Sequence, residues 1–278
     1  MGITLLSSEN IEGYAELLTP DVAENLTREH YRGIVLNTGN GMGAMVWELL
    51  NAESDKPTES IIRYVTASDE EAMEDLLDSY SDHIETDQVT RSSFELDNAS
   101  DVVRNGLAEA GFKCSDAEGS VLYVTLNDLI KIRAFGKRSP SYVSAIGGLR
   151  MVQMRQGIAN SIYYGKKGLL QDMAQLSRDW YEPDLSSCVI TDGKVNGLLL
   201  IHRKPSGILV PSLLYAAEPD ARKHLLFMLC FSVSAAGHDY SPGTTVEIHR
   251  HNAETRAIAA NLFPGAKGEK VIVGERKE

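Results

Sequence analysis

Hydrophobic and polar positions follow a pattern that occurs twice along the chain. Residues 31–47 read as two apolar strands around the stretch TGNGMG, and residues 187–201 read as two strands around DGKVNG. A further apolar strand follows in each half. After it come apolar residues at helical spacing, from Ala72 to Ile84 in the first half and from Leu225 to Val233 in the second. The pattern predicts a strand hairpin, a third strand and a helix in each half.

The second part of the pattern also recurs. The alternating segments SSFEL and TTVEI predict strands, helices are expected over 100–110 and 252–262, and the apolar segments VLYV and VIV close the two halves. Corresponding landmarks lie 148 to 154 residues apart: Gly39 and Gly193, Gly43 and Gly197, Pro57 and Pro205, Tyr64 and Tyr215, Glu95 and Glu247. Such self-similarity predicts a duplicated unit. We expect one domain over 1–135 and another over 136–278.

Helices are also expected ahead of each hairpin. In the second half they cover 152–164 and 167–180, and the first half has a shorter equivalent before residue 27. The helix after the third strand of the first half begins with Ser68-x-x-Glu71, which is typical of a capping box. Strands mixed with crossover helices predict an α/β fold with a mixed sheet.

This order of elements resembles the GNAT (Gcn5-related N-acetyltransferase) fold, twice over. The resemblance implies two tandem GNAT-like domains, acetyl-CoA or another acyl-CoA as the acyl donor, and an amine as the acceptor. It also implies a pyrophosphate site between the fourth strand and third helix, with the motif Arg/Gln-x-x-Gly-x-Gly/Ala. Glycine lets the backbone approach the phosphate, and a helix N-terminus presents unpaired N–H donors.

The second half keeps part of that motif. Arg222 follows Pro219 and matches the first motif position, but Leu225 and Phe227 stand where glycines are expected. The candidate cofactor-binding residues lie in the preceding strand and in this turn: Pro211, Leu213, Leu214, Arg222, Lys223 and His224. Pro211 cannot donate to a strand ladder, so it predicts an interruption of the strand. The alternative for the turn is a capped helix with a solvated basic first turn.

The first half departs further from the family pattern. Asp69, Glu70 and Glu71 occupy the matching turn, where they would complement the helix dipole and repel CoA. The general-acid Tyr that the resemblance implies falls at Ala259 and near Leu107, and neither can supply a proton.

The resemblance implies a Glu on the fourth or fifth strand as general base, and Glu247 qualifies by position, although a lone strand Glu is commonly a surface residue. His249 and His251 share a strand face, but no Cys or carboxylate stands at zinc spacing from them. We expect no metal site.

Charge separates the two halves. Residues 1–140 hold 26 acidic and 11 basic side chains, whereas residues 141–278 hold 13 and 16. The asymmetry suggests separate tasks for the two surfaces, or simply a solvated acidic face. No basic stretch indicates nucleic-acid binding, and no apolar run is long enough to span a membrane. The N-terminus lacks a signal-peptide pattern, and three dispersed cysteines argue against a disulfide framework. A cytoplasmic protein is expected.

Three functional hypotheses remain open. The first is an N-acyltransferase whose chemistry lies in the second half, with a structural first half. The second is a non-catalytic protein that has lost CoA use and binds a protein or small-molecule partner. In the third, the acidic first half recognises a cationic amine and presents it to the second half. The sequence names no acceptor and no oligomeric state.

Overall fold

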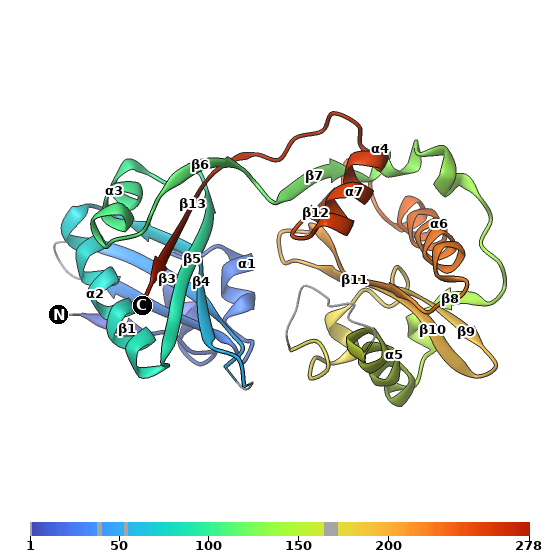
Figure 1. The fold of residues 1–278 in the computed structure, drawn as a ribbon, viewed down its shortest axis with the longest axis horizontal. Coiled ribbons are helices and arrows are strands. Elements are labelled where there is room, and N and C mark those ends of the chain that lie inside the picture. Colours follow the sequence, from blue (N-terminus) through green and yellow to red (C-terminus); the bar gives the residue numbers. More distant parts are fainter. Residues whose placement is uncertain (1, 38–40, 53–54, 164–171) are drawn as a thin grey trace. The chain divides into compact units, whose positions relative to one another are not determined.

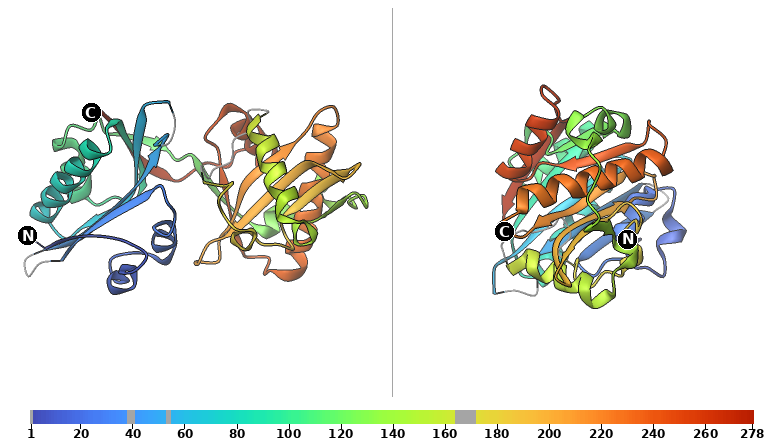
Figure 2. Two further views of the ribbon diagram at one scale, coloured as in Figure 1. Left: turned by 90° about the horizontal axis from the view of Figure 1, so that it is seen from below. Right: turned by 90° about the vertical axis from the view of Figure 1, so that its right-hand side faces the viewer.

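The computed structural model describes residues 2–37, 41–52, 55–163 and 172–278. The chain forms two compact units, residues 1–119 with 267–278 (unit 1) and residues 120–266 (unit 2). Both are mixed α/β structures with a central sheet (Figures 1 and 2). The expected α/β class is confirmed. Contacts divide the chain at Gly119 and again before Lys267, not at the boundary expected after residue 135.

Unit 1 has seven sheet strands within its described residues, in the order β1-β2-β3-β4-β5-β13-β6. Its elements are β1 (Ile3–Leu5), the 3-10 helix η1 (Ile11–Tyr14), α1 (Pro20–Asn25), β2 (Tyr31–Asn37), β3 (Met42–Leu50), β4 (Thr58–Ala67), α2 (Glu70–Thr86), β5 (Val89–Asp97), α3 (Asp101–Glu109), β6 (Ser115–Glu118) and β13 (Lys270–Lys277). Helices α2 and α3 pack on one sheet face around Trp47, and η1 and α1 cover the other.

Unit 2 has six sheet strands within the described residues, in the order β7-β12-β11-β10-β9-β8. Its elements are β7 (Val121–Thr125), α4 (Leu126–Ile130), the 3-10 helix η2 (Arg133–Gly136), β8 (Val143–Ala145), the 3-10 helix η3 (Ile146–Gly148), α5 (Met151–Tyr163), the 3-10 helix η4 (Arg178–Trp180), β9 (Ser187–Thr191), β10 (Lys194–Arg203), β11 (Leu209–Ala216), α6 (Ala221–Asp239), β12 (Thr245–His249) and α7 (Ala253–Leu262). Helix α6 packs on one sheet face and α5 on the other.

The closing strands of the two halves are exchanged. VLYV, in β7, pairs antiparallel with β12 of unit 2. VIV, in β13, lies between β5 and β6 of unit 1 and pairs antiparallel with both (Figure 1). The expectation that each half closes with its own strand was therefore wrong. Leu122 and Val124 pack in unit 2, and Val271 and Ile272 are buried in unit 1, so both strands gain apolar contacts where they lie.

The hairpins of the two units share a close contact between strand and helix. Gly43 on β3 and Gly197 on β10 both lie under a helix. A Cβ on Gly43 would come within 2.7 Å of Leu76 on α2, and a Cβ on Gly197 within 3.0 Å of Met228 on α6. Glycine at these positions lets strand and helix approach closely. Residues 38–40, including Gly39, lie outside the described residues.

Three local expectations need correction. The N-cap of α2 is Asp69 rather than Ser68, because the Asp69 carboxylate accepts the Ala72 N–H. The helix expected over 167–180 falls partly outside the described residues, and residues 172–177 form turns that bury Met173. Tyr64 and Tyr215 are not equivalent in the strand pairing. Tyr64 is paired with Val46 on β3, whereas Tyr215 is paired with Leu198 on β10.

Candidate functional site

Both units interrupt the strand that precedes the long helix. In unit 2 the register between β10 and β11 shifts between Leu200 and Ile201, whose partners are Leu213 and Pro211, so Ser212 is the extra residue. The interruption predicted from Pro211 is confirmed. In unit 1 the shift falls between Val46 and Trp47, and Arg63 is the extra residue. A bulge removes backbone groups from the ladder and re-aims side chains, which is why bulges are common beside functional sites.

Strands β11 and β12 separate next to the bulge of unit 2. They are parallel, and the pair in register among the described residues is Leu209 with Val246. In unit 1 the parallel strands β4 and β5 stay paired from Thr58 to Ile62, and β4 is interrupted directly after that point. Residues of β11 and β12 beyond Leu209 and Val246 therefore border the candidate site.

The candidate cofactor-binding residues have unequal surroundings. Leu213 is buried in the core on the α5 face, and Leu214 packs in the core on the α6 face. Pro211 lies at the bulge, so the strand residues line the interruption mainly through their backbone. At the helix start, Arg222 and Lys223 are exposed, whereas His224 is buried against the Tyr142 ring.

The turn before α6 differs from a glycine-rich phosphate loop. The N–H groups of Lys223 and His224 already bond to the Asp220 carbonyl, so the helix is formed where the motif would be an open loop. Leu225 and Phe227 pack against the core of unit 2. The helix dipole and two exposed cations suit a phosphate, but close backbone approach at the glycine positions is not available here.

Glu247 lies on the β12 face that points away from α6, and it is only 3 % exposed. Its carboxylate accepts from Lys204 Nζ at 2.6 Å and from His249 Nε2 at 2.5 Å. Burial alone would raise the pKa of Glu247, but the His249 hydrogen bond and the Lys204 charge outweigh it and lower the pKa to about 2. An ionised, doubly paired carboxylate is a weak proton acceptor at neutral pH. Glu247 stands at the position expected for the general base, but its two ion-pair partners and its low pKa do not favour it as that base.

The charged cluster continues just beyond the end of β12. His249 Nδ1 lies 2.9 Å from His251 Nε2, and His251 is exposed. Side chains at i, i+2 and i+4 of a strand share a face. This spacing could have grouped Glu247 with the two histidines from sequence alone, whereas Lys204 comes from another strand end. Among the described residues there is no group of three or more side chains arranged to hold a metal ion.

At the matching position of unit 1, an ion pair fills the α1 face beside the bulge. Arg63 Nη2 and Nε donate to one oxygen of Glu48 at 2.6 and 2.9 Å, and the Tyr31 hydroxyl donates to it at 3.2 Å. Burial, followed by the Glu48 charge, raises the pKa of Tyr31 to about 12. The Arg28 guanidinium lies 4.7 Å from the centre of the Tyr31 ring. The cluster holds the interrupted strand in place.

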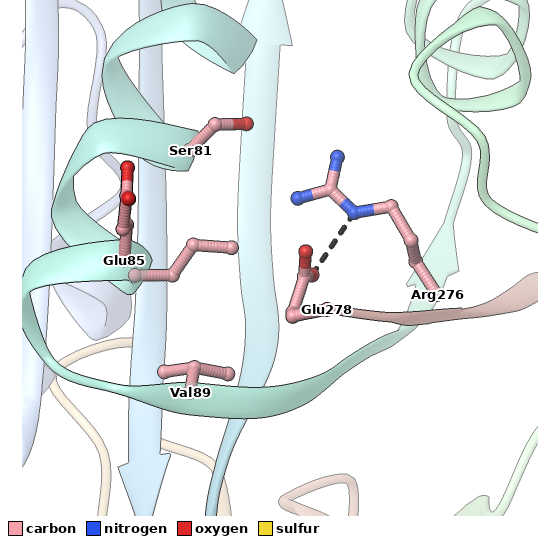
Figure 3. A pocket seen from close by; sticks show the side chains of 6 residues that line it. Ser81, Glu85, Val89, Arg276 and Glu278 are labelled. Carbon is pink, nitrogen blue, oxygen red and sulfur yellow. Dashed lines mark hydrogen bonds and ion pairs between the residues drawn. The ribbon is translucent and has the colours of Figure 1, made fainter.

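Two pockets lie away from these bulges. One, of about 530 Å³, lies in unit 1 at the C-terminal end of α2 (Figure 3). Its Arg276 donates to Glu278 and to the Ala110 carbonyl, so the cation is engaged in structural contacts. The other, of about 500 Å³, is lined by Glu182, Arg203 and Tyr240 near the C-terminal end of α6. Burial, followed by a hydrogen bond to Glu182, raises the pKa of Tyr240 to about 12. Both pockets lie at the C-terminal end of a long helix, whereas the expected phosphate site lies at the N-terminal end.

The two general-acid positions implied by the GNAT resemblance are buried and apolar. Ala259 on α7 is 2 % exposed and Leu107 on α3 is fully buried. Neither unit therefore places a Tyr there.

Comparison with solved structures agrees with this architecture over nearly the full length. A tandem GNAT protein from the clavulanic acid biosynthesis pathway (without AcCoA) matches with a TM-score of 0.59 at 11 % identity, covering 99 % of this chain and 98 % of that one. The chain has a tandem GNAT fold. A GCN5-related N-acetyltransferase from Sphaerobacter thermophilus matches with a TM-score of 0.51 at 12 % identity, covering 99 % and 95 %.

Another matched structure carries a different name. The C-terminal domain (DUF2156) of a putative lysylphosphatidylglycerol synthetase from Agrobacterium fabrum matches with a TM-score of 0.52 at 14 % identity, covering 96 % of this chain and 91 % of that one. No protein-family model matches the sequence, and no curated protein matches it. No helix in the described parts of the chain is both long and apolar enough to cross a bilayer.

Proposed function

We propose that unit 2 is an N-acyltransferase that transfers an acyl group from acetyl-CoA or another acyl-CoA to an amine. The observation that carries the proposal is the bulge of β11 at Ser212 beside β12, which separates from β11 and bears Glu247 and His249, with His251 two residues beyond its end. Backbone groups released from a ladder can polarise a thioester carbonyl, and a histidine can accept a proton from an amine near neutral pH. A cytoplasmic location, where acyl-CoA is present, belongs to this proposal.

The phosphate contacts of this proposal come from the start of α6. Arg222 and Lys223 are exposed in its first turn, at the positive end of the helix dipole. Because Leu225 and Phe227 pack against the core, side chains rather than a glycine-rich loop would supply most of the contacts. Binding of CoA should therefore be weak and strongly dependent on salt.

Calorimetric titration with acetyl-CoA tests the donor, and release of free thiol in the presence of a panel of amines tests the transfer. Replacing both Arg222 and Lys223 with Ala should reduce CoA affinity at least about tenfold, since each charge-assisted contact contributes on the order of 1 kcal/mol or more. Lys194→Ala, on an exposed hairpin residue of the same unit, is the matched control. Folded protein that gives no heat at millimolar acetyl-CoA would remove the basis of the proposal.

A second candidate function is supported by the charge of unit 1. Its residues hold 28 acidic and 11 basic side chains, a net charge of −17, whereas unit 2 holds 11 and 16, a net charge of +5. Under this alternative the protein binds a cationic partner or amine through unit 1 without using CoA. Spermine is a suitable probe. Salt-sensitive spermine binding that weakens in a Glu70→Gln, Glu71→Gln variant, together with absent thiol release, would favour this alternative.

A further inference from the structure

The polar pocket of about 500 Å³ in unit 2 is not used by the proposed acyl transfer. Its volume falls in the range of small-molecule sites, which is roughly 300–1,000 Å³. Four stretches of the chain meet at this pocket: the segment between η4 and β9, the end of β10, the end of α6, and the loop before β12. Its charged and aromatic lining residues are Glu182, Asp184, Arg203, Asp239 and Tyr240.

The pocket brings together charges of both signs that do not pair with each other. Asp184, Asp239 and Arg203 are exposed, and none of these three side chains forms an ion pair or a hydrogen bond with the described residues. The Arg203 guanidinium instead lies over the Tyr240 ring, 5.6 Å from its centre. Each of these charged groups can therefore take a group of opposite charge from a ligand.

Tyr240 fixes the remaining carboxylate of the pocket. It directly follows α6, and its N–H donates to the Ala236 carbonyl. Its hydroxyl is hydrogen-bonded to Glu182, and burial, followed by that bond, raises the pKa of Tyr240 to about 12. The hydroxyl is thus protonated at neutral pH and donates to Glu182, which leaves Asp184 and Asp239 as the open carboxylates. The negative end of the α6 dipole also favours a cation here.

The open groups define the chemistry of a matching ligand. Two carboxylates call for two cationic groups, and the Arg203 guanidinium calls for one anionic group. A guanidinium binds a carboxylate through two parallel hydrogen bonds, which makes it selective for that planar anion. An α-amino acid with a cationic side chain carries one carboxylate, one α-ammonium and one further cation. A bare metal ion or a simple diamine offers no anion, and Arg203 would repel it.

We propose that this pocket binds a basic α-amino acid, with the ligand carboxylate on Arg203 and the two cationic groups on Asp184 and Asp239. The site goes beyond the proposed acyl transfer and does not need acyl-CoA. Because its charged side chains are exposed, water screens each contact. Binding should therefore be weak, with a Kd of roughly 0.1–1 mM.

Titration of the full chain without acyl-CoA tests the ligand class. The probes are L-ornithine, L-lysine and L-arginine, which differ in side-chain length. Cadaverine is lysine without its carboxylate, and L-norleucine is lysine without its side-chain ammonium. The tightest basic amino acid should bind at least about tenfold more tightly than either analogue. Calorimetry and ligand-observed NMR are used together, so that binding without heat is detected. Folded protein that binds none of the three at about 10 mM would overturn the proposal.

Two substitutions locate the binding. Arg203→Gln should lower the affinity for the basic amino acid at least about tenfold and leave cadaverine binding unchanged or stronger, because a cation is removed. Asp239→Asn should weaken both ligands. Asp192→Asn is the matched control, since it makes the same change to an exposed residue in the turn between β9 and β10. Equal weakening by the two Asp→Asn variants would show attraction by net charge alone and would overturn the site.

Unit 1 provides the competing explanation, because its net charge of −17 attracts any cation. Binding to that surface would favour cadaverine, which carries two positive charges and no negative one, over lysine. It would also be insensitive to Arg203→Gln. That pair of results would overturn the pocket assignment. Neither outcome depends on thiol release, so the amino-acid site and the acyltransferase proposal stand or fall separately.

Discussion

Units 1 and 2 share a backbone irregularity and use it differently. The register shifts after Val46 in unit 1 and after Leu200 in unit 2, positions 154 residues apart. In unit 1 the extra residue is Arg63, whose guanidinium is bound by buried Glu48. In unit 2 the extra residue is Ser212, and the paired charged side chains, Glu247 and His249, lie on the neighbouring strand β12. The comparison shows how one duplicated scaffold can hold a buried ion pair in one copy and a charged cluster that reaches the surface in the other.

The turn before the long helix also separates the two units. Asp69 caps α2 through its side chain, whereas Asp220 makes no side-chain cap on α6. Acidic Glu70 and Glu71 follow in α2, and basic Arg222 and Lys223 follow in α6. An anionic donor would therefore be repelled by the first copy and attracted by the second. The four predictions below test how far the two copies differ.

The largest effect is expected from removal of β13. A chain that ends at residue 266 loses the strand between β5 and β6, and with it the buried side chains of Val271 and Ile272. The loss should exceed the roughly 5–15 kcal/mol by which domains are stable, so unit 1 should unfold while unit 2 stays folded. Trp47 lies in unit 1 and Trp180 in unit 2. Fluorine NMR of 5-fluorotryptophan protein then reports each unit separately.

A peptide of residues 267–278 added in trans is the control, and it should restore the Trp47 resonance where a scrambled peptide does not. A native Trp47 resonance in the truncated chain without peptide would show that unit 1 does not depend on the exchanged strand.

The next effect concerns the ion pair of unit 1. Glu48→Gln leaves Arg63 and Tyr31 facing an uncharged group in a site where Glu48 is 2 % exposed. Breaking a buried pair in this way should cost about 3 kcal/mol of the unfolding free energy of unit 1. Denaturant unfolding followed at Trp47 measures it. Glu275→Gln is the control, because the Arg91–Glu275 pair is more than half exposed and should cost under about 0.5 kcal/mol. Equal costs for the two variants would contradict the structural role of Glu48.

The sequence predicted the elements of both copies better than their connections. Alternation and helical spacing identified the hairpins, and the missing N–H of Pro211 identified the strand interruption. They could not assign VLYV and VIV to a sheet, because a short apolar strand can pair in either one and tertiary packing decides. Nor could they show that Glu247 is paired, since Lys204 reaches it from a distant part of the chain. Whether Arg222, Lys223 and His224 contact a donor remains a prediction.

A smaller effect should distinguish unit 2 by its response to acid. The pKa of Glu247 is about 2 in the folded protein, below the ordinary value of 4.5. Its ionisation therefore stabilises unit 2 fully above pH 4.5, and the contribution is lost as the pH falls toward 2. Between pH 6 and pH 3 the loss from this group should be about 2 kcal/mol. Unfolding followed at Trp180 should show that extra loss in the wild type and not in Glu247→Gln. The same slope in both proteins would mean that another group is responsible.

The smallest effect compares the two helix starts directly. Asp69→Ala removes a carboxylate that accepts the Ala72 N–H, so the first turn of α2 loses a partner for one of its unpaired donors. Asp220→Ala removes a side chain that makes no such bond. The melting temperature of unit 1 should fall by a few degrees in the first variant, and that of unit 2 should stay constant in the second. Thermal melts that resolve Trp47 from Trp180 measure both. If Asp220→Ala also lowers the melting temperature, α6 is capped in solution by the same means as α2, and the two turns differ only in the sign of the side chains that follow the cap.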